Sequence, residues 1–200
     1  MIKTLISQLA WKNLPFVLTW LILLSLIQLI QTQFPLFEFH VSNIQLAEFW
    51  RIVTGHFVHS NIHHLLMNSA ALLALWSLHG HYYQARSISI LIILSCLFIS
   101  AFLTIFSEID IYFGFSGVLH ALVCWGALKD IGQREQTGYL LLAALICKLF
   151  YEQFFGASQS TEELIGVAVA TKAHLAGALF GLFYYCGQKA CKRGHKNLNS

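Results

Sequence analysis

Long apolar runs separated by short polar stretches dominate this chain. A helix that crosses a membrane needs about 20 mostly apolar residues. On this criterion the pattern predicts six helical segments: Leu14–Ile30, His59–Leu78, Ile88–Phe106, Ser116–Leu128, Gly138–Phe155 and Thr171–Gly187. The fourth segment is too short to cross a bilayer alone, so we expect it to lie inside a bundle of the others. The pattern therefore predicts an all-α, polytopic membrane protein with six transmembrane helices and a short fourth helix.

The composition agrees with a membrane protein. Hydrophobic residues make up 57% of the chain and charged residues only 10%, whereas about a quarter of the residues in a soluble domain are charged. No internal repeat or second domain is visible, so residues 1–200 are expected to form one membrane domain, with 188–200 as a basic tail. No basic stripe is interleaved with aromatic residues, so the sequence predicts no nucleic-acid partner. The five cysteines show neither disulfide nor zinc-site spacing.

The basic residues predict the orientation in the membrane. Nine of the twelve lie on one side of the predicted bundle: Lys3, Lys12, Arg86, Lys129, Arg134, Lys189, Lys192, Arg193 and Lys196. Because cytoplasmic loops carry the excess of Lys and Arg, this side and both termini are predicted to be cytoplasmic.

This orientation gathers polar residues near the outer face. Ser116 lies at the outer end of the fourth segment, and His174 near the outer end of the sixth. His59, His64 and Asn68 lie in the first turns of the second segment. Polar side chains inside a membrane bundle are costly and usually functional. Their common depth predicts one site, in which His174 accepts the proton of a Ser116 nucleophile.

Small residues in these segments favour the close approach that this pair needs. Gly177 and Gly181 recur at four-residue spacing in the sixth segment, and Gly117 and Ala121 do so in the fourth. Such spacing lets transmembrane backbones come close together. Gly114 and Gly117 are also expected to free the backbone around Ser116 for an unusual turn.

Acyl transfer also needs donors for a developing oxyanion. His64 and Asn68 share one helical face, and the Ser116 N–H at a helix N-terminus is a third candidate. Neither the fourth nor the sixth segment contains Asp or Glu. The sequence therefore predicts a Ser–His dyad rather than a triad.

Four motifs in order resemble the rhomboid intramembrane serine proteases. "GFSG" at 114–117 is similar to their GxSG, "AHLAGALFG" at 173–181 to their AHxxGxxxG, and "FWR" at 49–51 to the Trp-Arg of their first loop. "HFVHSNIHHLLMN" at 56–68 carries HxxxxHxxxN at His59, His64 and Asn68. The resemblance covers 49–187. It implies Ser116 as nucleophile, His174 as base, and His64 and Asn68 at the oxyanion hole. It implies supporting roles for the remaining motif residues: Arg51, His59, Gly114, Gly117, Gly177 and Gly181.

The residue four positions after the serine narrows the resemblance. Many rhomboids have Tyr there, whereas this chain has His120, and "GFSGVLHA" resembles the GxSGxLHG of the rhombosortase branch. Ala121 departs from the Gly of that motif. We expect His120 to stack on or hydrogen-bond His174. The branch implies a bacterial inner-membrane enzyme that opens to the periplasm and needs no cofactor or metal. Its implied substrates are membrane-anchored proteins with a C-terminal Gly-Gly motif, a transmembrane helix and a basic tail.

Three alternatives compete with this interpretation. The chain can be a general rhomboid protease that cleaves single-pass transmembrane proteins. It can be a metal- or haem-binding membrane protein, since His56, His59, His63 and His64 lie close together in the sequence. It can also be a catalytically inactive rhomboid-like binding protein. Separately, Lys148 and Glu152 are expected to form an i,i+4 pair inside the fifth segment, or Lys148 to snorkel outward.

Overall fold

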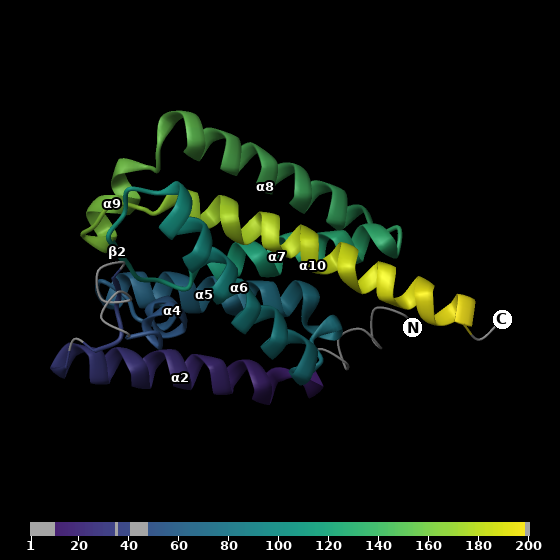
Figure 1. The fold of residues 1–200 in the computed structure, drawn as a ribbon, viewed down its shortest axis with the longest axis horizontal. Helices are drawn as coiled ribbons and strands as arrows, with labels where there is room; N and C mark the ends of the chain where they lie inside the picture. Colours follow the sequence, from purple (N-terminus) through teal and green to yellow (C-terminus); the bar gives the residue numbers. More distant parts are fainter. Residues whose placement is uncertain (1–10, 35, 41–47, 199–200) are drawn as a thin grey trace.

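The structure, a computed structural model, describes the backbone of residues 11–34, 36–40 and 48–198, and the side chains of these up to residue 191. Six long helices form the bundle (Figure 1): α2 (Leu14–Gln33), α5 (Ile62–His79), α6 (Ala85–Phe106), α7 (Ser116–Gly132), α8 (Gln136–Phe155) and α10 (Thr171–Leu198). Each predicted segment overlaps one of them.

Short elements connect the long helices at their ends. These are β1 (Phe39–His40), α4 (Arg51–Thr54), η1 (Gly55–Phe57), η2 (Gly80–Tyr82), β2 (Ile111–Tyr112) and α9 (Gln159–Ile165). β1 and β2 pair antiparallel, with Phe39 opposite Tyr112. The pairing ties the segment after α2 to the loop that precedes α7.

Three of the helices are long and apolar enough to cross a membrane: α2, α6 and α8. The described residues contain eight α-helices in all, because the short α4 and α9 add to the long ones. The number of six membrane-spanning helices therefore stays a prediction.

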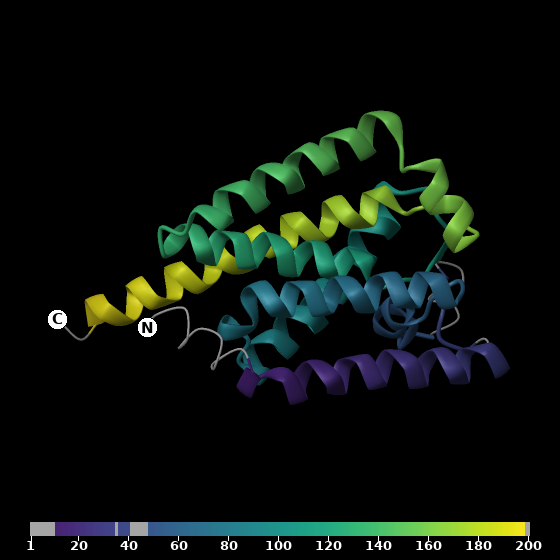
Figure 2. The ribbon, with the colours of Figure 1, turned by 180° about the vertical axis from the view of Figure 1, so that it is seen from behind.

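The helices are arranged around α7 and α10. α2 and α8 lie on opposite flanks of the molecule, and α7 and α10 run between them in both views (Figures 1 and 2). α9 and β2 lie at one end of the bundle, and the C-terminal part of α10 projects beyond the other end (Figure 1).

α7 is the central helix, as expected for a segment too short to cross a bilayer alone. It contacts α5, α6, α8 and α10, and Val118, Leu122 and Trp125 along it are almost fully buried. It has 17 residues and continues to Gly132, one turn beyond the predicted end at Leu128. The helix continues past the apolar run, and a polar residue of its last turn is satisfied there, with Asp130 accepting from the Thr137 hydroxyl at 2.8 Å.

α7 and α10 touch backbone to backbone, as their small residues predict. A Cβ added at Gly177 would overlap the carbonyl oxygen of Gly117, and one added at Gly181 would overlap that of Ala121. Both contacts repeat after four residues, so the two helices run in the same direction at a fixed register. This packing brings the N-terminal turns of α7 and α10 together.

Caps and turns fix the elements around these N-terminal turns. The Oδ1 atom of Asn61 accepts the N–H of His64 at 2.9 Å and so caps the start of α5. Gly166, in the left-handed region at φ +75°, ends α9. The start of α5 lies beside the end of α9, because the Asn61 amide also donates to the Leu164 carbonyl at 3.1 Å.

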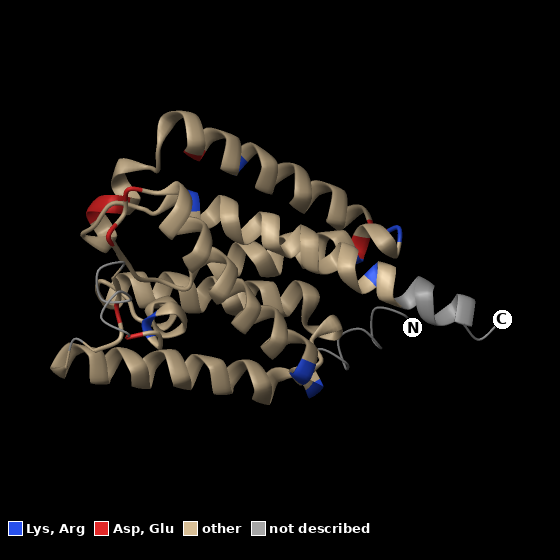
Figure 3. Ribbon diagram, in the orientation of Figure 1, with Lys and Arg blue, Asp and Glu red and all other residues tan. Residues whose placement is uncertain are grey.

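The charges are distributed unevenly along the bundle. Acidic residues gather at the end that holds α9 and β2, and Lys and Arg occur near the opposite end, with a few charges of each kind elsewhere (Figure 3). Lys3 and the basic side chains of the tail from Lys192 onward lie outside the described residues. The predicted orientation therefore stays a prediction.

Candidate active site

Ser116 is the first residue of α7 and follows a tightly held loop. Gly114 has φ +120°, a backbone conformation that residues with a side chain rarely adopt. A Cβ atom at this position would also lie only 2.8 Å from Cε1 of His64. The Gly114 N–H donates to the Gly55 carbonyl at 3.2 Å, and its carbonyl accepts from the Tyr112 hydroxyl at 2.7 Å. Gly114 thus makes the turn that was predicted here. Gly117 does not, because it lies within α7 and serves the contact with α10.

Ser116 and His174 are within hydrogen-bonding distance. The Oγ atom of Ser116 lies 2.9 Å from Nε2 of His174. His174 is buried, with 5% of its surface exposed, whereas Ser116 is half-buried and lines a cavity. The structure therefore brings together the two residues predicted as nucleophile and base.

A carboxylate from a third helix contacts the other nitrogen of His174. The Oε2 atom of Glu152, on α8, lies 2.9 Å from Nδ1 of His174, and Glu152 is 7% exposed. The sequence predicts a dyad because the fourth and sixth segments contain no Asp or Glu. The structure adds a contact from the neighbouring α8, which that reasoning did not consider, and the dyad itself stays a prediction. The signal in the sequence was a Glu inside an apolar segment.

Glu152 also binds Lys148, one turn earlier on α8. The Lys148 ammonium donates to Oε1, the second carboxylate oxygen. The expected i,i+4 pair is thus present. The Lys148 side chain is 48% exposed and lines the same cavity as Ser116.

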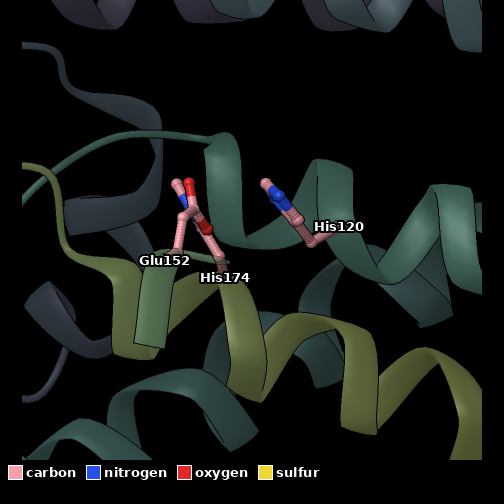
Figure 4. A group of neighbouring side chains, drawn as sticks. All are labelled: His120, Glu152 and His174. Atoms are coloured by element: carbon pink, nitrogen blue, oxygen red, sulfur yellow. The ribbon is translucent and has the colours of Figure 1, made fainter. Parts of the chain in front are cut away.

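His120 stacks on His174, one of the two arrangements expected for it. The ring centroids are 4.1 Å apart and the ring planes differ by 13°. The Nδ1 atom of His120 lies 2.7 Å from the Ser116 carbonyl oxygen, so this nitrogen donates. Figure 4 shows the side chains of His120, Glu152 and His174, each of which comes from a different helix.

Two candidate hydrogen-bond donors belong to residues that line the cavity beside Ser116. The Nδ2 group of Asn68 is buried and has no hydrogen-bond partner within the described part of the chain. A buried amide without a partner is rare and costly unless a ligand completes it. The Ser116 N–H opens a helix, so it has no intrahelical acceptor. Both residues line the cavity, and their function in an oxyanion hole stays a prediction.

His64 lies beside this space with its Nε2 edge toward Gly114. Its Nδ1 atom is 3.1 Å from the hydroxyl of Ser60, which itself donates to the Ile165 carbonyl at 2.7 Å. A hydroxyl has one hydrogen, so here the Ser60 oxygen accepts and Nδ1 of His64 carries the proton. In the neutral ring Nε2 is then an acceptor, and it donates to an oxyanion only after His64 gains a proton or changes tautomer.

The cavity around these residues has a volume of about 860 Å³. Residues of α5, α7, α8, α9 and α10 line it, together with the segments 109–113 and 167–170. Most lining side chains are apolar, and the polar ones include Ser116, His174, Asn68 and Glu152. A cavity of this size and lining is typical of a ligand-binding site.

A comparison with protein families identifies the chain. The family model for the rhomboid domain matches residues 46–188. The chain belongs to the rhomboid family. The members of this family are intramembrane serine proteases, and the family and the apolar helices together make this chain a membrane protein. No curated protein matches the chain.

Two of the predicted supporting residues of this rhomboid, His59 and Arg51, make their described contacts with residues other than Ser116 and His174. The His59 ring meets the His64 ring edge to face, with centroids 5.0 Å apart. Arg51 does not line the cavity: it binds Glu48 at 2.6 Å and the Glu38 carbonyl at 3.0 Å, which holds the loop before α4.

His56 contacts the loop that precedes Ser116 in this rhomboid. Its Nε2 atom lies 3.0 Å from the Ser100 hydroxyl, and its ring contacts Tyr112 edge to face at 5.0 Å. Burial lowers the pKa of His56 to about 3, so the ring is neutral. Tyr112 in turn holds Gly114, so His56 acts on the structure of the loop.

The four histidines predicted as alternative metal or haem ligands do not form one group: the rings of His59 and His64 meet, but no third metal-ligating side chain lies close to them among the described residues. His59 is buried, His63 is exposed, and His64 is bonded to Ser60. Among the described residues, the one group close enough for an ion is His120, Glu152 and His174. A metal binds along a nitrogen lone pair, in the plane of the imidazole ring. The nearly parallel rings of His120 and His174 do not aim their lone pairs at one point, so the arrangement favours proton transfer over metal binding.

Proposed function

We propose that this rhomboid is an active serine endopeptidase that cleaves membrane-anchored proteins, with Ser116 as the nucleophile and His174 as the general base. The 2.9 Å contact between Ser116 Oγ and His174 Nε2 carries the proposal. A serine hydroxyl is a weak nucleophile until an adjacent base accepts its proton, and this contact provides the base.

The reaction proceeds in two halves. The Ser116 oxygen attacks the carbonyl carbon of the scissile peptide, and its proton moves to Nε2 of His174. When the C–N bond breaks, the imidazolium returns this proton to the leaving amine, and an acyl-enzyme remains. A water molecule, or an amine acceptor, then gives its proton to His174 and attacks the acyl carbon. When the ester bond breaks, the imidazolium returns this proton to the Ser116 oxygen.

The developing oxyanion is stabilised by donors that are in place before the reaction. The Asn68 amide and the Ser116 N–H supply two donors, and the unpaired state of Asn68 Nδ2 supports this role. His64 adds a third when its Nε2 carries a proton. His120 supports the base, since its stacked ring and its bond to the Ser116 carbonyl restrict both partners.

The proposed location of the site is near the outer face of a bacterial inner membrane, with both termini in the cytoplasm and the cavity open to the periplasm. The excess of basic residues near the end of the chain supports this orientation. The cavity lies at the opposite end of α10 from the basic tail.

The proposed substrates carry a C-terminal Gly-Gly motif followed by a transmembrane helix and a basic tail. The resemblance of "GFSGVLHA" to the rhombosortase motif supports this assignment. The identity of His120 supports it further, because many rhomboids have Tyr at this position.

The catalytic assignment is tested by labelling the purified protein in detergent with a fluorescent fluorophosphonate. An activated serine attacks phosphorus, and fluoride leaves. We expect the wild type to be labelled and both Ser116→Ala and His174→Ala to lose labelling while retaining their melting temperatures. Labelling of Ser116→Ala at the wild-type rate would overturn the assignment.

The substrate class is tested with two reporters in the same membranes. One ends in Gly-Gly, a hydrophobic helix and a basic cluster; the other carries an internal transmembrane segment without Gly-Gly. We expect the first reporter alone to be cleaved, in a Ser116-dependent manner. Equal cleavage of both would identify a general rhomboid protease instead.

A further inference from the structure

The second nitrogen of His174 is held as firmly as the first. Nδ1 lies 2.9 Å from Glu152 Oε2, the same distance that separates Nε2 from the Ser116 hydroxyl. Both members of the Glu152–His174 contact are less than 10% exposed. The acid is thus part of the buried site and not a surface ion pair.

This contact fixes which nitrogen carries the proton. An ionised carboxylate only accepts hydrogen bonds, so Nδ1 of His174 must donate. In the neutral ring, Nε2 then has a free lone pair, and it points at the Ser116 hydroxyl. The base is therefore in the tautomer that can accept the proton of Ser116.

We infer that Glu152 is a positioning residue of the reaction: it orients His174, selects its reactive tautomer and stabilises the imidazolium that forms when Ser116 attacks. The inference rests on the proposed function and adds a third member to the Ser116–His174 pair. Charge is produced on His174 during the reaction, and a negative group at 2.9 Å favours that charge in a poorly solvated site.

Lys148 offsets part of the negative charge of the Glu152 carboxylate. Its ammonium binds Oε1 while His174 binds Oε2, so one carboxylate serves two cations once the imidazolium forms. Removing Lys148 leaves the negative charge of Glu152 undivided, whereas removing Glu152 leaves His174 without an anion and close to a lysine. The two changes therefore act on the imidazolium in opposite directions.

A merely structural function for Glu152 predicts something different. If Glu152 only neutralised Lys148 and joined α8 to α10, its loss would lower stability and active fraction equally at every pH. A positioning function predicts that the pH dependence of the reaction moves, because the acidic limb reports protonation of the base.

The test measures the second-order rate of fluorophosphonate labelling between pH 5 and 9, with the full-length protein in detergent. For Glu152→Gln we expect a loss of about 10²-fold or more at neutral pH, since loss of the triad acid reduces serine protease catalysis strongly. The remaining activity should show its acidic limb at lower pH. Glu152→Asp should recover part of the rate because it retains the carboxylate. For Lys148→Met the acidic limb should move to higher pH.

Glu163→Gln is the matched control, because this exposed glutamate of α9 bonds only to Gln159 among the contacts described for it. It makes the same carboxylate-to-amide change outside the site and should leave the rate and pH dependence unaltered. Wild-type labelling and pH dependence in Glu152→Gln would overturn the inference. If Glu152→Gln does not fold, an unmoved acidic limb in Lys148→Met overturns it alone. Failure of the proposed function is distinct, since the wild type and Ser116→Ala would then label alike.

Discussion

At the scale of single residues, each histidine of the site has a hydrogen-bond partner that determines which ring nitrogen carries the proton. Glu152 does this for His174, the Ser116 carbonyl for His120, and Ser60 for His64. Proton positions in the site therefore follow from acceptors with no hydrogen left to give: a carboxylate, a carbonyl, and a hydroxyl whose one hydrogen goes to Ile165. Asn68 is the exception, because its buried Nδ2 group has no acceptor among the described residues.

Asn68→Ala tests what this unpaired amide does. Removing one oxyanion donor from a serine protease reduces kcat by about 10²–10³-fold. We expect a loss of this size in the cleavage of a membrane-anchored reporter, with KM little changed, because the donor acts on the transition state. The melting temperature should stay constant or rise, because the buried donor makes no bond in the free protein.

Gln159→Ala is the control for loss of an amide, since this residue lies on the exposed surface of α9. It should leave kcat unaltered. A KM increase without loss of kcat in Asn68→Ala would show that the amide binds substrate and not the oxyanion.

Most of the residues that meet at the site could be predicted from depth alone. Ser116, His174, His64 and Asn68 each lie near the same end of a predicted segment, so the direction of the segments was enough to bring them together. Glu152 could not be placed in this way. Its pairing with Lys148 already satisfied it within one helix, and only the packing of α8 on α7 and α10 shows that its second oxygen reaches His174.

At the scale of elements, the contact between α7 and α10 decides the geometry of the site. Gly177 and Gly181 lie against main-chain oxygens of α7, which cannot move aside as a flexible side chain can. The small-residue spacing predicted this contact. The sequence did not predict α9, because seven residues with mixed polarity carry too weak a periodic signal.

Gly177→Ala tests the contact with a single methyl group. The added carbon overlaps the Gly117 carbonyl, so the helices must separate and the distance between Ser116 and His174 must change. Overpacking of this kind costs about 1–3 kcal/mol. We expect a lower melting temperature and a labelling rate at least about 10-fold below that of the wild type.

Gly187→Ala is the matched control on the same helix, since a Cβ at Gly187 meets nothing within 4 Å. It should retain full labelling and a melting temperature equal to or above that of the wild type, because alanine favours helices over glycine. Equal behaviour of the two variants would show that α7 and α10 do not touch as described.

At the scale of the whole molecule, the site lies at one end of the bundle and the C-terminal end of α10 at the other (Figure 1). The proposed orientation therefore makes opposite predictions for two exposed positions, Ser158 just before α9 and Cys191 late in α10. The buried Cys96 and Cys124 can remain, because they are not accessible to reagents.

Cysteine labelling in cells tests this orientation. In a protein whose exposed cysteines are replaced by serine, Ser158→Cys should react with a membrane-impermeant maleimide added to spheroplasts. A protein that retains only Cys191 among the exposed cysteines should react only after the membrane is permeabilised. The reverse pattern would place the site in the cytoplasm.

The repeated contact between α7 and α10 also has a mechanical consequence. Gly117 meets Gly177 and Ala121 meets Gly181, so the two helices are in close contact at successive turns. A sliding motion cannot proceed by one residue; it must pass a whole repeat of four, which is about 6 Å of helix. Thickening or thinning of the bilayer acts first on the flanking α2 and α8, whose surfaces are largely exposed. The contact between α7 and α10 therefore fixes Ser116 relative to His174, whereas Glu152, on the exposed α8, is the member of the site that a change of the bilayer reaches first.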